Sequence, residues 1–434
     1  MDIYIGVGGI FMLFFLILIG ANVMVALGAV GLIGSALIVG FPAAASMFST
    51  TFYHTAHSFE FSVIPMFLLM GYFAFRANLG SDIFKAVNAW MGGIRGGLAI
   101  STTLASAGFG AASGSSIGTA MLFTKIALPE MLSRGYNKSL ASASIAIAGT
   151  LAVMIPPSTV VIIYGILTDA SIGKLLIAGV IPGLVFGVVL CITIYITVRL
   201  KPSLAPTVSH SVSLRDKFLS LRHVGPLLLV ILIIIVGLYV GFFTPTEAGA
   251  VGAALVLLIA LVRRRSIKAL HLRSTLLETT ETTAMIFAVI ICALVFSRFL
   301  ALSGVTGLFN DMFDQLGDNR LAVLGVVTLI YLVLGTMMDA PSLLAISLPL
   351  THPVMMKMGF DPIWFGVYVV LLVEVAAITP PVGINCFVVQ AASGGRLELE
   401  DIFRGIVPFL IASAAMLALL YIFPQLALFL PSNM

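Results

Sequence analysis

The sequence predicts an all-α, polytopic membrane protein with about ten transmembrane helices, and three observations lead to this fold class. Of the 434 residues, 60% are hydrophobic and only 9% are charged, whereas an ordinary soluble domain carries roughly 25% charged residues. The apolar residues form stretches of roughly 17–30 residues, each long enough for a helix to cross a hydrocarbon core of about 30 Å. Alternating segments of about ten residues, typical of membrane β-barrels, are absent from the sequence.

The composition also argues against other classes of protein. The net charge of +4 comes from basic residues in the short connections between apolar stretches, so it does not indicate nucleic-acid binding. Cys191, Cys292 and Cys386 are far apart and lie in apolar runs, so they predict neither a disulfide framework nor a metal site. The N-terminus lacks the basic segment and cleavage site of a secretory signal, and we expect the first apolar stretch to be retained.

Two basic clusters predict the orientation of the chain in the membrane. Between them lie apolar spans at 224–243 and 248–262, which we expect to form a scaffold helix pair within residues 200–262. The positive-inside rule places both clusters in the cytoplasm, and the turn Thr244-Pro245-Thr246-Glu247 outside, where it matches a capping box that starts a helix. The clusters are Arg199, Lys201, Arg215, Lys217 and Arg222 in one case, and Arg263, Arg264, Arg265, Lys268 and Arg273 in the other.

Residues 1–62 are expected to contain scaffold helices at about 3–20 and 22–40, with the N-terminus outside. His54 and His57 form an H-x-x-H pair that we expect on an outward loop, where it is a weak metal signal.

Residues 63–199 are expected to form the first of two structural repeats. Basic residues flank the apolar segment 96–132 on both sides, and both flanks need to lie in the cytoplasm. We therefore expect this segment to enter and leave on one face, as a re-entrant hairpin with its tip at Ser113-Gly114-Ser115-Ser116. The elements of this repeat are a span at 61–77, the hairpin 96–132, a helix at 138–168 broken at Pro156-Pro157, and a span at 174–199.

A second repeat, 263–434, follows at an offset of 224 residues. Pro-Pro recurs at 380–381, and coincident Pro and Gly positions constrain the backbone more than apolar identities do. Because the second hairpin is entered from outside, the two halves have opposite topology, which is the pattern of transporters with inverted repeats. Its elements are a span at 276–302, a hairpin at 320–358 with its tip at Met337-Met338-Asp339-Ala340-Pro341, a helix at 363–393 broken at Thr379-Pro380-Pro381, and a span at 405–430.

The hairpin tips and helix breaks are the predicted binding site for the transported solute and its coupling cation, because irregular backbone at membrane depth is tolerated only where it is buried in protein or lines a wet cavity. Carbonyls freed at a break are suitable ligands for Na⁺, and the N-termini of half-helices favour an anionic substrate group. The opposing interpretation is that proline and glycine only kink or pack membrane helices.

Two acidic residues lie near the second pair of interruptions. Asp339 at the hairpin tip is a candidate site residue, and it also fits a cap for the second arm of the hairpin. Glu374 lies shortly before the second break, and both a ligand or relay role and a polar packing contact remain open.

With these elements in place, the chain resembles, over essentially its full length, the large membrane subunit of tripartite ATP-independent periplasmic (TRAP) transporters, the DctM type. The stretches that carry the resemblance are Ile64-Pro65-Met66-Phe67, Ala112-Ser113-Gly114-Ser115-Ser116, Ala127-Leu128-Pro129-Glu130-Met131, Ile155-Pro156-Pro157-Ser158, Phe243-Thr244-Pro245-Thr246-Glu247-Ala248, Gly335-Thr336-Met337-Met338-Asp339 and Ile378-Thr379-Pro380-Pro381-Val382-Gly383.

The resemblance implies a Na⁺-driven elevator without an organic cofactor, and it implies the residues of its sites. For Na⁺ these are Ser113, Gly114, Ser115, Pro156, Pro157, Gly335, Thr336, Met338, Asp339, Thr379, Pro380 and Gly383. For the substrate they are Ser115, Ser116, Ser158, Asp339, Ala340 and Asn385. Some members of the family carry an acidic residue shortly after the first tip, where this chain has Gly118-Thr119, which leaves open how the charge of the first cation is balanced.

The resemblance also implies the setting of the protein, a bacterial inner membrane crossed many times and in contact with lipid. Its expected partners are a separate small four-helix membrane subunit and a periplasmic solute-binding protein that delivers an organic acid, most often a C4-dicarboxylate.

Three other functions were weighed against this one. A stand-alone, cation-coupled anion carrier of a related elevator fold remains the alternative. Ala112-Ser113-Gly114 resembles the serine loop of intramembrane proteases, but such a nucleophile needs a histidine base, and of six histidines only His352 lies within a predicted hairpin arm. An ATP-driven pump is disfavoured because the sequence contains no G-x-x-x-x-G-K-[ST] loop.

Overall fold

The computed structural model describes residues 2–206, 213–264, 271–314, 317 and 319–434, and the described part is helical, without strands. This confirms the predicted all-α class. Arg265 and Lys268 of the second basic cluster lie outside the described residues.

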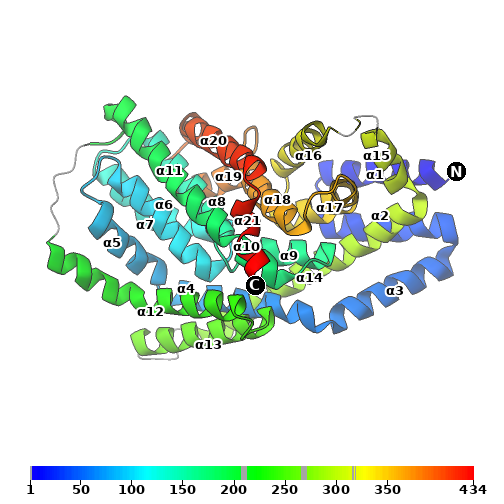
Figure 1. Cartoon of the computed structure of the whole chain (residues 1–434), viewed down its shortest axis with the longest axis horizontal. Coiled ribbons are helices and arrows are strands. Elements are labelled where there is room, and N and C mark those ends of the chain that lie inside the picture. The colour runs from blue at the N-terminus through cyan, green and yellow to red at the C-terminus, as the bar shows by residue number, and fades with distance from the viewer. Residues whose placement is uncertain (1, 207–212, 265–270, 315–316, 318) are drawn as a thin grey trace.

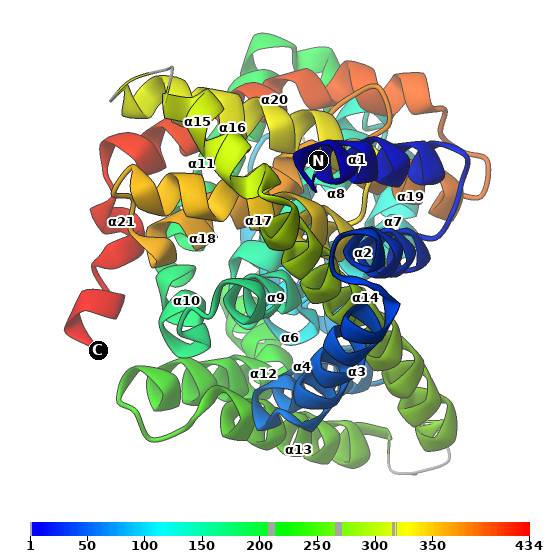
Figure 2. The same ribbon diagram turned by 90° about the vertical axis from the view of Figure 1, so that its right-hand side faces the viewer.

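The N-terminal and central helices form one group around α14, with α2 and α3 beside it (Figure 2). They are α1 (Asp2–Leu18), α2 (Val23–Val39), α3 (Phe41–His57), the 3₁₀ turn η1 (Phe59–Ser62), α4 (Val63–Arg76), α12 (Leu214–Tyr239), α13 (Pro245–Arg264) and α14 (Leu272–Ser303). The capping box is confirmed: the Glu247 Nα donates to Thr244 Oγ1 at 3.3 Å, and the Thr244 Nα donates to Glu247 Oε2 at 2.8 Å.

The expectation that His54 and His57 lie on an outward loop is wrong, because both belong to α3. Residues Ala44, Thr51 and Thr55 form a narrow buried stripe on this helix, which packs against α2 and α14. Small residues allow such close approach between membrane helices. The ring of His57 stacks on Tyr53, with centroids 5.6 Å apart, and the described residues contain no group of three metal-ligating side chains.

The first repeat consists of two hairpin arms, a broken helix and a long span, preceded by an amphipathic helix. These are α5 (Leu79–Met91), α6 (Gly97–Ser113), α7 (Ser116–Ser133), α8 (Lys138–Met154), α9 (Thr159–Thr168), α10 (Ile172–Ala178), α11 (Val180–Leu200) and the short turn η2 (Pro202–Leu204).

The second repeat follows the same plan. Its elements are α15 (Val305–Asp314), α16 (Arg320–Gly335), α17 (Ala340–Lys357), α18 (Pro362–Ala376), α19 (Ile384–Ala392), α20 (Leu399–Ile422), α21 (Gln425–Leu428) and η4 (Pro431–Asn433). Helices α15, α16, α17, α18, α19 and α20 lie close to the positions of α5, α6, α7, α8, α9 and α11 plus 224 residues.

Equivalent residues also have equivalent local roles in the two repeats. Gly135 and Gly359, which are 224 residues apart, both adopt positive φ, at 80° and 74°, and glycine accepts this conformation without strain. Asn137 and Asp361 follow them and cap α8 and α18: the Asn137 side chain accepts from Ser139 Nα at 2.9 Å and the Asp361 side chain from Ile363 Nα at 2.8 Å. Both Pro-Pro peptide bonds are cis.

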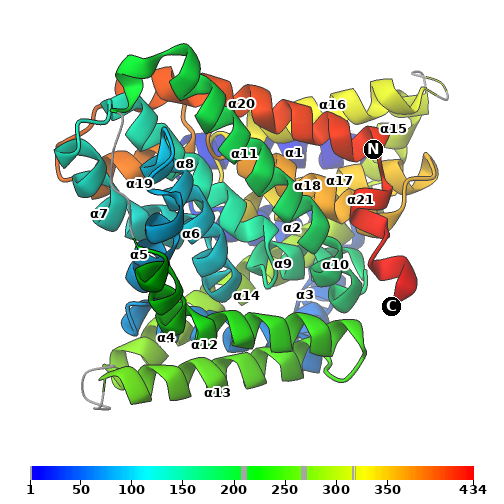
Figure 3. The ribbon, with the colours of Figure 1, turned by 60° about the vertical axis from the view of Figure 1, so that its left-hand side comes forward.

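The helices are arranged so that α12 and α13 line one edge of the molecule, and α11 and α20 run side by side along the opposite edge (Figures 1 and 3). By length and composition alone, five helical segments of the described residues can cross a membrane, or up to seven if two bent helix pairs each count as one span. Helices α1, α2, α16 and α18 are apolar but shorter. Each of the ten predicted spans contains one of these helices or helix pairs.

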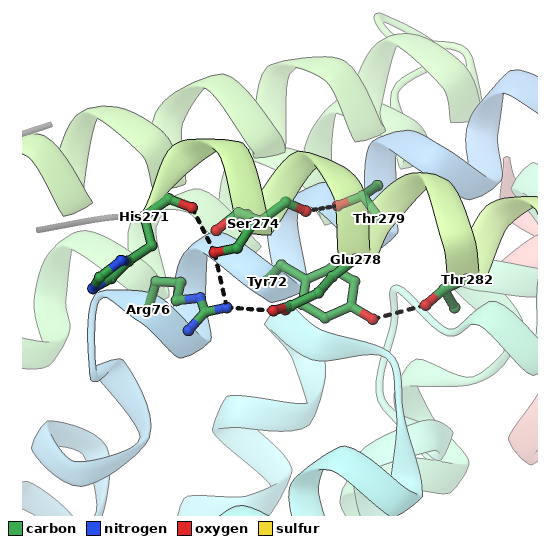
Figure 4. Close-up of polar contacts among 8 residues, drawn as sticks. Tyr72, Arg76, His271, Ser274, Glu278, Thr279 and Thr282 are labelled. Carbon is green, nitrogen blue, oxygen red and sulfur yellow. Dashed lines mark hydrogen bonds and ion pairs between the residues drawn. The ribbon is translucent and has the colours of Figure 1, made fainter. Parts of the chain in front are cut away.

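A polar network joins α4 to α14 (Figure 4). Arg76 donates to Glu278 Oε1 at 2.5 Å and to Ser274 Oγ at 3.4 Å, and the Tyr72 hydroxyl lies 2.8 Å from that of Thr282. In addition, Arg263 of α13 pairs with Asp82 of α5. These contacts join the helix that leads into the first hairpin to the central helix group.

Candidate functional site

The first hairpin tip lies directly against the first helix break. Gly114, between α6 and α7, has φ +59°, and its carbonyl accepts from Thr159 Oγ1 at 2.8 Å. A Cβ added at Gly114 would lie 3.2 Å from the Pro157 carbonyl oxygen, so the close approach of these two backbones requires glycine.

Four hydroxyl groups complete this first interruption. Ser115 caps α7 by accepting from Gly118 Nα at 3.2 Å, and the Ser113 and Thr119 hydroxyls lie 3.0 Å apart. Ser158 caps α9 by accepting from Val161 Nα at 3.4 Å. Helices α7 and α9 therefore both begin at the first interruption, and the positive ends of their helix dipoles point toward it.

The second hairpin tip contacts the second break through the backbone. The Gly383 Nα, with φ +65°, donates to the Thr336 carbonyl at 3.2 Å. The Thr379 hydroxyl donates to the Val375 carbonyl at 2.7 Å and so terminates α18. Asp339 occupies the predicted N-cap position of α17, with Pro341 in the first turn, but its side chain makes no capping hydrogen bond.

The two repeats meet at Glu374. This residue of α18 has 1% of its surface exposed, and its Oε2 atom has no hydrogen-bond partner. Its carboxyl interacts with the side chain of Ser116, the first residue of α7. The first tip therefore contacts its own break on one side and a carboxylate of the second repeat on the other.

Asn385 is the other orphaned polar group of the second break. It is fully buried, and neither its side-chain oxygen nor its nitrogen has a hydrogen-bond partner. Its Nα donates to the Ala377 carbonyl at 2.9 Å, which holds it at the start of α19. Because buried amides are normally satisfied, these atoms are suited to contact a bound ligand.

The structure thus brings the predicted residues together in two groups, one for each repeat. The first contains Ser113, Gly114, Ser115, Ser116, Pro156, Pro157 and Ser158, and the second contains Gly335, Thr336, Met338, Asp339, Ala340, Thr379, Pro380, Gly383 and Asn385. No hydrogen bond among the described residues joins Asp339 to the first group. Thr159 was not among the predicted residues, although its position directly after Pro-Pro-Ser could have identified it.

The described part of the chain places no histidine base beside the serine of the first tip. Within the described chain, the Ser113 hydroxyl pairs with Thr119, whereas the His352 ring lies against Tyr164 and Phe365. The arrangement does not support a protease.

A helical membrane protein with two topologically matched halves, each with a hairpin tip against a broken helix, has the architecture of a secondary transporter. The family model described as "Tripartite ATP-independent periplasmic transporter, DctM component" matches residues 10–426. The chain therefore belongs to the DctM family, the large permease component of TRAP transporters; it is a multi-pass inner-membrane protein and not an enzyme.

Known proteins place this assignment in context. The chain is 34% identical over 403 residues to the C4-dicarboxylate TRAP transporter large permease protein DctM of Pseudomonas aeruginosa, and the match covers 93% of each chain. It is 27% identical to the isethionate TRAP transporter permease protein DctMQ of Oleidesulfovibrio alaskensis, covering 86% of this chain and 58% of that one.

A solved structure supports the fold alone. The YdaH transporter of Alcanivorax borkumensis superposes with a TM-score of 0.58 at 13% identity, covering 89% of each chain. Large permeases of the family work with a small permease subunit and a periplasmic binding protein.

Proposed function

We propose that this chain is the large membrane subunit of a Na⁺-driven importer for a small organic anion, which a periplasmic solute-binding protein delivers. The observation that carries the proposal is the pairing of each hairpin tip with a helix break, through Thr159 to Gly114 in the first repeat and Gly383 to Thr336 in the second. Paired interruptions of this kind place substrate and coupling ions near the middle of the membrane.

The residues present fit Na⁺ in both groups. The carbonyls of residues 155–157 and 379–381 accept no hydrogen bond from the described chain, so they offer free oxygen ligands. Hydroxyls of Ser113, Ser115 and Thr336 belong to the hairpin tips that contact these breaks. When bound, Na⁺ would supply positive charge that favours an anionic substrate nearby.

Glu374 is proposed to balance the charge of a cation at the first tip. The first tip has no acidic residue of its own, since Gly118-Thr119 follows it. A buried carboxylate with no positive charge beside it is costly and needs a compensating charge. The interaction of Glu374 with Ser116 places such a carboxylate at the first tip, and a bound cation there would compensate it.

The substrate is proposed to be a small organic anion of the C4-dicarboxylate type or another carboxylate. The Pseudomonas relative is named for C4-dicarboxylates and the Oleidesulfovibrio relative for isethionate, so the shared property is a small molecule with an acidic group. The N-termini of α7 and α9 and the buried Asn385 amide offer backbone and side-chain donors for such a group.

An elevator movement is proposed for transport. The ion pairs Arg76–Glu278 and Arg263–Asp82 hold α4, α5, α13 and α14 together, and the helices α5 and α15 connect this group to the two hairpins. Spin labels on α13 and α9 are expected to change their separation when Na⁺ and substrate are added, and an unchanged separation would contradict the movement.

The experiment that tests the function is uptake into proteoliposomes. The chain is co-reconstituted with its small subunit, and radiolabelled C4-dicarboxylates and sulfonates are added with the periplasmic binding protein. Uptake is expected only with an inward Na⁺ gradient and with all three components. Na⁺-dependent uptake by the chain alone would instead support the stand-alone carrier, and uptake unaffected by replacing Na⁺ with K⁺ would overturn the coupling.

A further inference from the structure

A groove between α11 and α20 contains none of the residues of the hairpin tips or helix breaks. It has a volume of about 800 Å³ and lies between these two helices, which pack against each other; in Figure 3, α20 runs along the upper edge and α11 descends away from it. Its floor includes Gly405 of α20, where an added Cβ would clash with the Ser139 carbonyl of α8. The close approach of α20 and α8 closes one side of the groove.

The walls of the groove are apolar. Ile192, Ile196 and Leu200 line it from α11, and Val407, Ile411 and Ala415 line it from α20. The spacing of four residues places each set on one helix face, and these six residues are exposed in the isolated chain. Over eight residues each wall is about 12 Å long, which suits a hydrocarbon chain and not a small soluble ion.

The mouth of the groove is basic. Lys138, Lys201 and Arg404 line it, together with one acidic residue, Asp401. The Asp401 carboxylate accepts from Glu398 Nα in the capping box of α20, so it is already engaged. Arg404 pairs with Glu400 at 2.8 Å, but both side chains are about three-quarters exposed, and such a pair is weak.

Helix ends add to the positive potential at this mouth. Helix α8 begins at Lys138 and α20 begins at Leu399, so the positive dipole ends of two long helices lie there, together with the negative end of one, α11, at Leu200. The positive-inside rule places the same end in the cytoplasm, since the basic cluster around Arg199 and Lys201 follows α11 directly.

We infer that this groove binds an anionic phospholipid of the cytoplasmic leaflet, with its phosphate between Lys138, Lys201 and Arg404 and an acyl chain between α11 and α20. Charge complementarity at the mouth and apolar walls behind it are the combination that an anionic amphiphile requires. Because α8 is the first half of a broken helix, a lipid held here would contact the helix that carries the transport site.

The inference is tested by native mass spectrometry of the purified complex in mild detergent. Phosphatidylglycerol, phosphatidylcholine and inorganic phosphate are each titrated into the wild type and into the variant Lys138→Gln/Lys201→Gln/Arg404→Gln. Retention of phosphatidylglycerol is expected to fall about fivefold for each charge removed, and retention of phosphatidylcholine is expected to change little. Arg199→Gln is the matched control, because Arg199 is an exposed neighbour of Lys201 that does not line the groove.

A second variant tests the acyl-chain part and leaves the charges in place. Ala415→Phe is expected to fill the groove and reduce phosphatidylglycerol retention, with an unchanged melting temperature in neutral detergent showing that the fold persists. An equal loss of phosphatidylglycerol retention in the Arg199→Gln control would overturn the inference. Full phosphatidylglycerol retention in both groove variants would overturn it as well. Displacement of the lipid by inorganic phosphate alone would show an anion site without an acyl chain, and cross-linking of Ile411→Cys to the small subunit would show a protein interface; either result would also overturn the inference.

Discussion

The first and second interruptions occupy equivalent positions in the two repeats but differ in how they are held open. The first break, residues 155–158, is mostly buried and contains no glycine, so its prolines alone interrupt the helix. The second break, residues 377–383, is longer and exposes Pro380 and Pro381, and Gly383 adds a positive φ of 65°. The two breaks therefore occupy equivalent positions but differ in their residues. A single substitution should disturb the first break more than the second, because fewer residues interrupt the helix there.

The largest effect is expected from Pro157→Leu. Leucine restores an N–H at residue 157 and removes one of the two prolines that hold this break open, so uptake in proteoliposomes should fall to the rate of empty vesicles. Pro226→Leu, within α12, is the matched control and should keep full uptake. Pro381→Leu should retain measurable uptake because Gly383 still interrupts the second helix, and equal loss in both repeats would contradict the comparison.

The next largest effect is expected from Glu374→Gln. Glutamine keeps the volume of the side chain but removes the negative charge that faces Ser116 and would face a bound cation. Uptake at a fixed Na⁺ concentration should therefore fall about tenfold to a hundredfold. Glu281→Gln changes an exposed carboxylate of α14 and serves as the control. Unchanged Na⁺ activation in the Glu374 variant would show that this carboxylate has only a packing role.

Asp339→Ala is expected to have a smaller effect, since Asp339 is half-exposed at the second tip. The Na⁺ concentration for half-maximal uptake should rise about tenfold, as for the loss of one charge-assisted contact. Asp311→Ala, an exposed acid on α15, should leave this concentration unchanged. An identical response of the two variants would remove Asp339 from the proposed cation site.

The smallest effect is expected from Thr159→Val, which removes the hydroxyl that donates to the Gly114 carbonyl and keeps the side-chain shape. A neutral hydrogen bond contributes about 1 kcal/mol, so uptake should fall about fivefold. Thr168→Val is a matched control on the same helix, because its hydroxyl donates to the Tyr164 carbonyl within α9 and not to a hairpin tip. A larger loss in the control would indicate a general effect on α9.

The sequence was sufficient for the features that depend on local chemistry. The basic flanks of residues 96–132 located the first hairpin, the topology of the second repeat located the other, and the two Pro-Pro pairs located the breaks. Asn137 and Asp361 cap their helices as their shared offset suggests. Helix α3 was missed because its Ser, Thr and His residues lower its hydropathy, and its helical conformation depends on packing a small-residue stripe against α2 and α14.

The contact between Glu374 and Ser116 could not be predicted, since it joins residues 258 positions apart in the sequence. The repeat offset predicts which residues correspond to one another, but it does not predict how the two halves pack together. For the same reason, the groove between α11 and α20 became visible only in three dimensions.

The way the two halves pack has a consequence for biosynthesis. Helix α9 of the first repeat packs against α17, and α19 of the second repeat packs against α7. The N-terminal half leaves the ribosome first, so α7 and α9 enter the bilayer before the helices that cover them exist. Their open backbone ends must be shielded by water or by the insertion machinery until α19 is synthesised, and a chain truncated after α14 would expose them permanently to quality control.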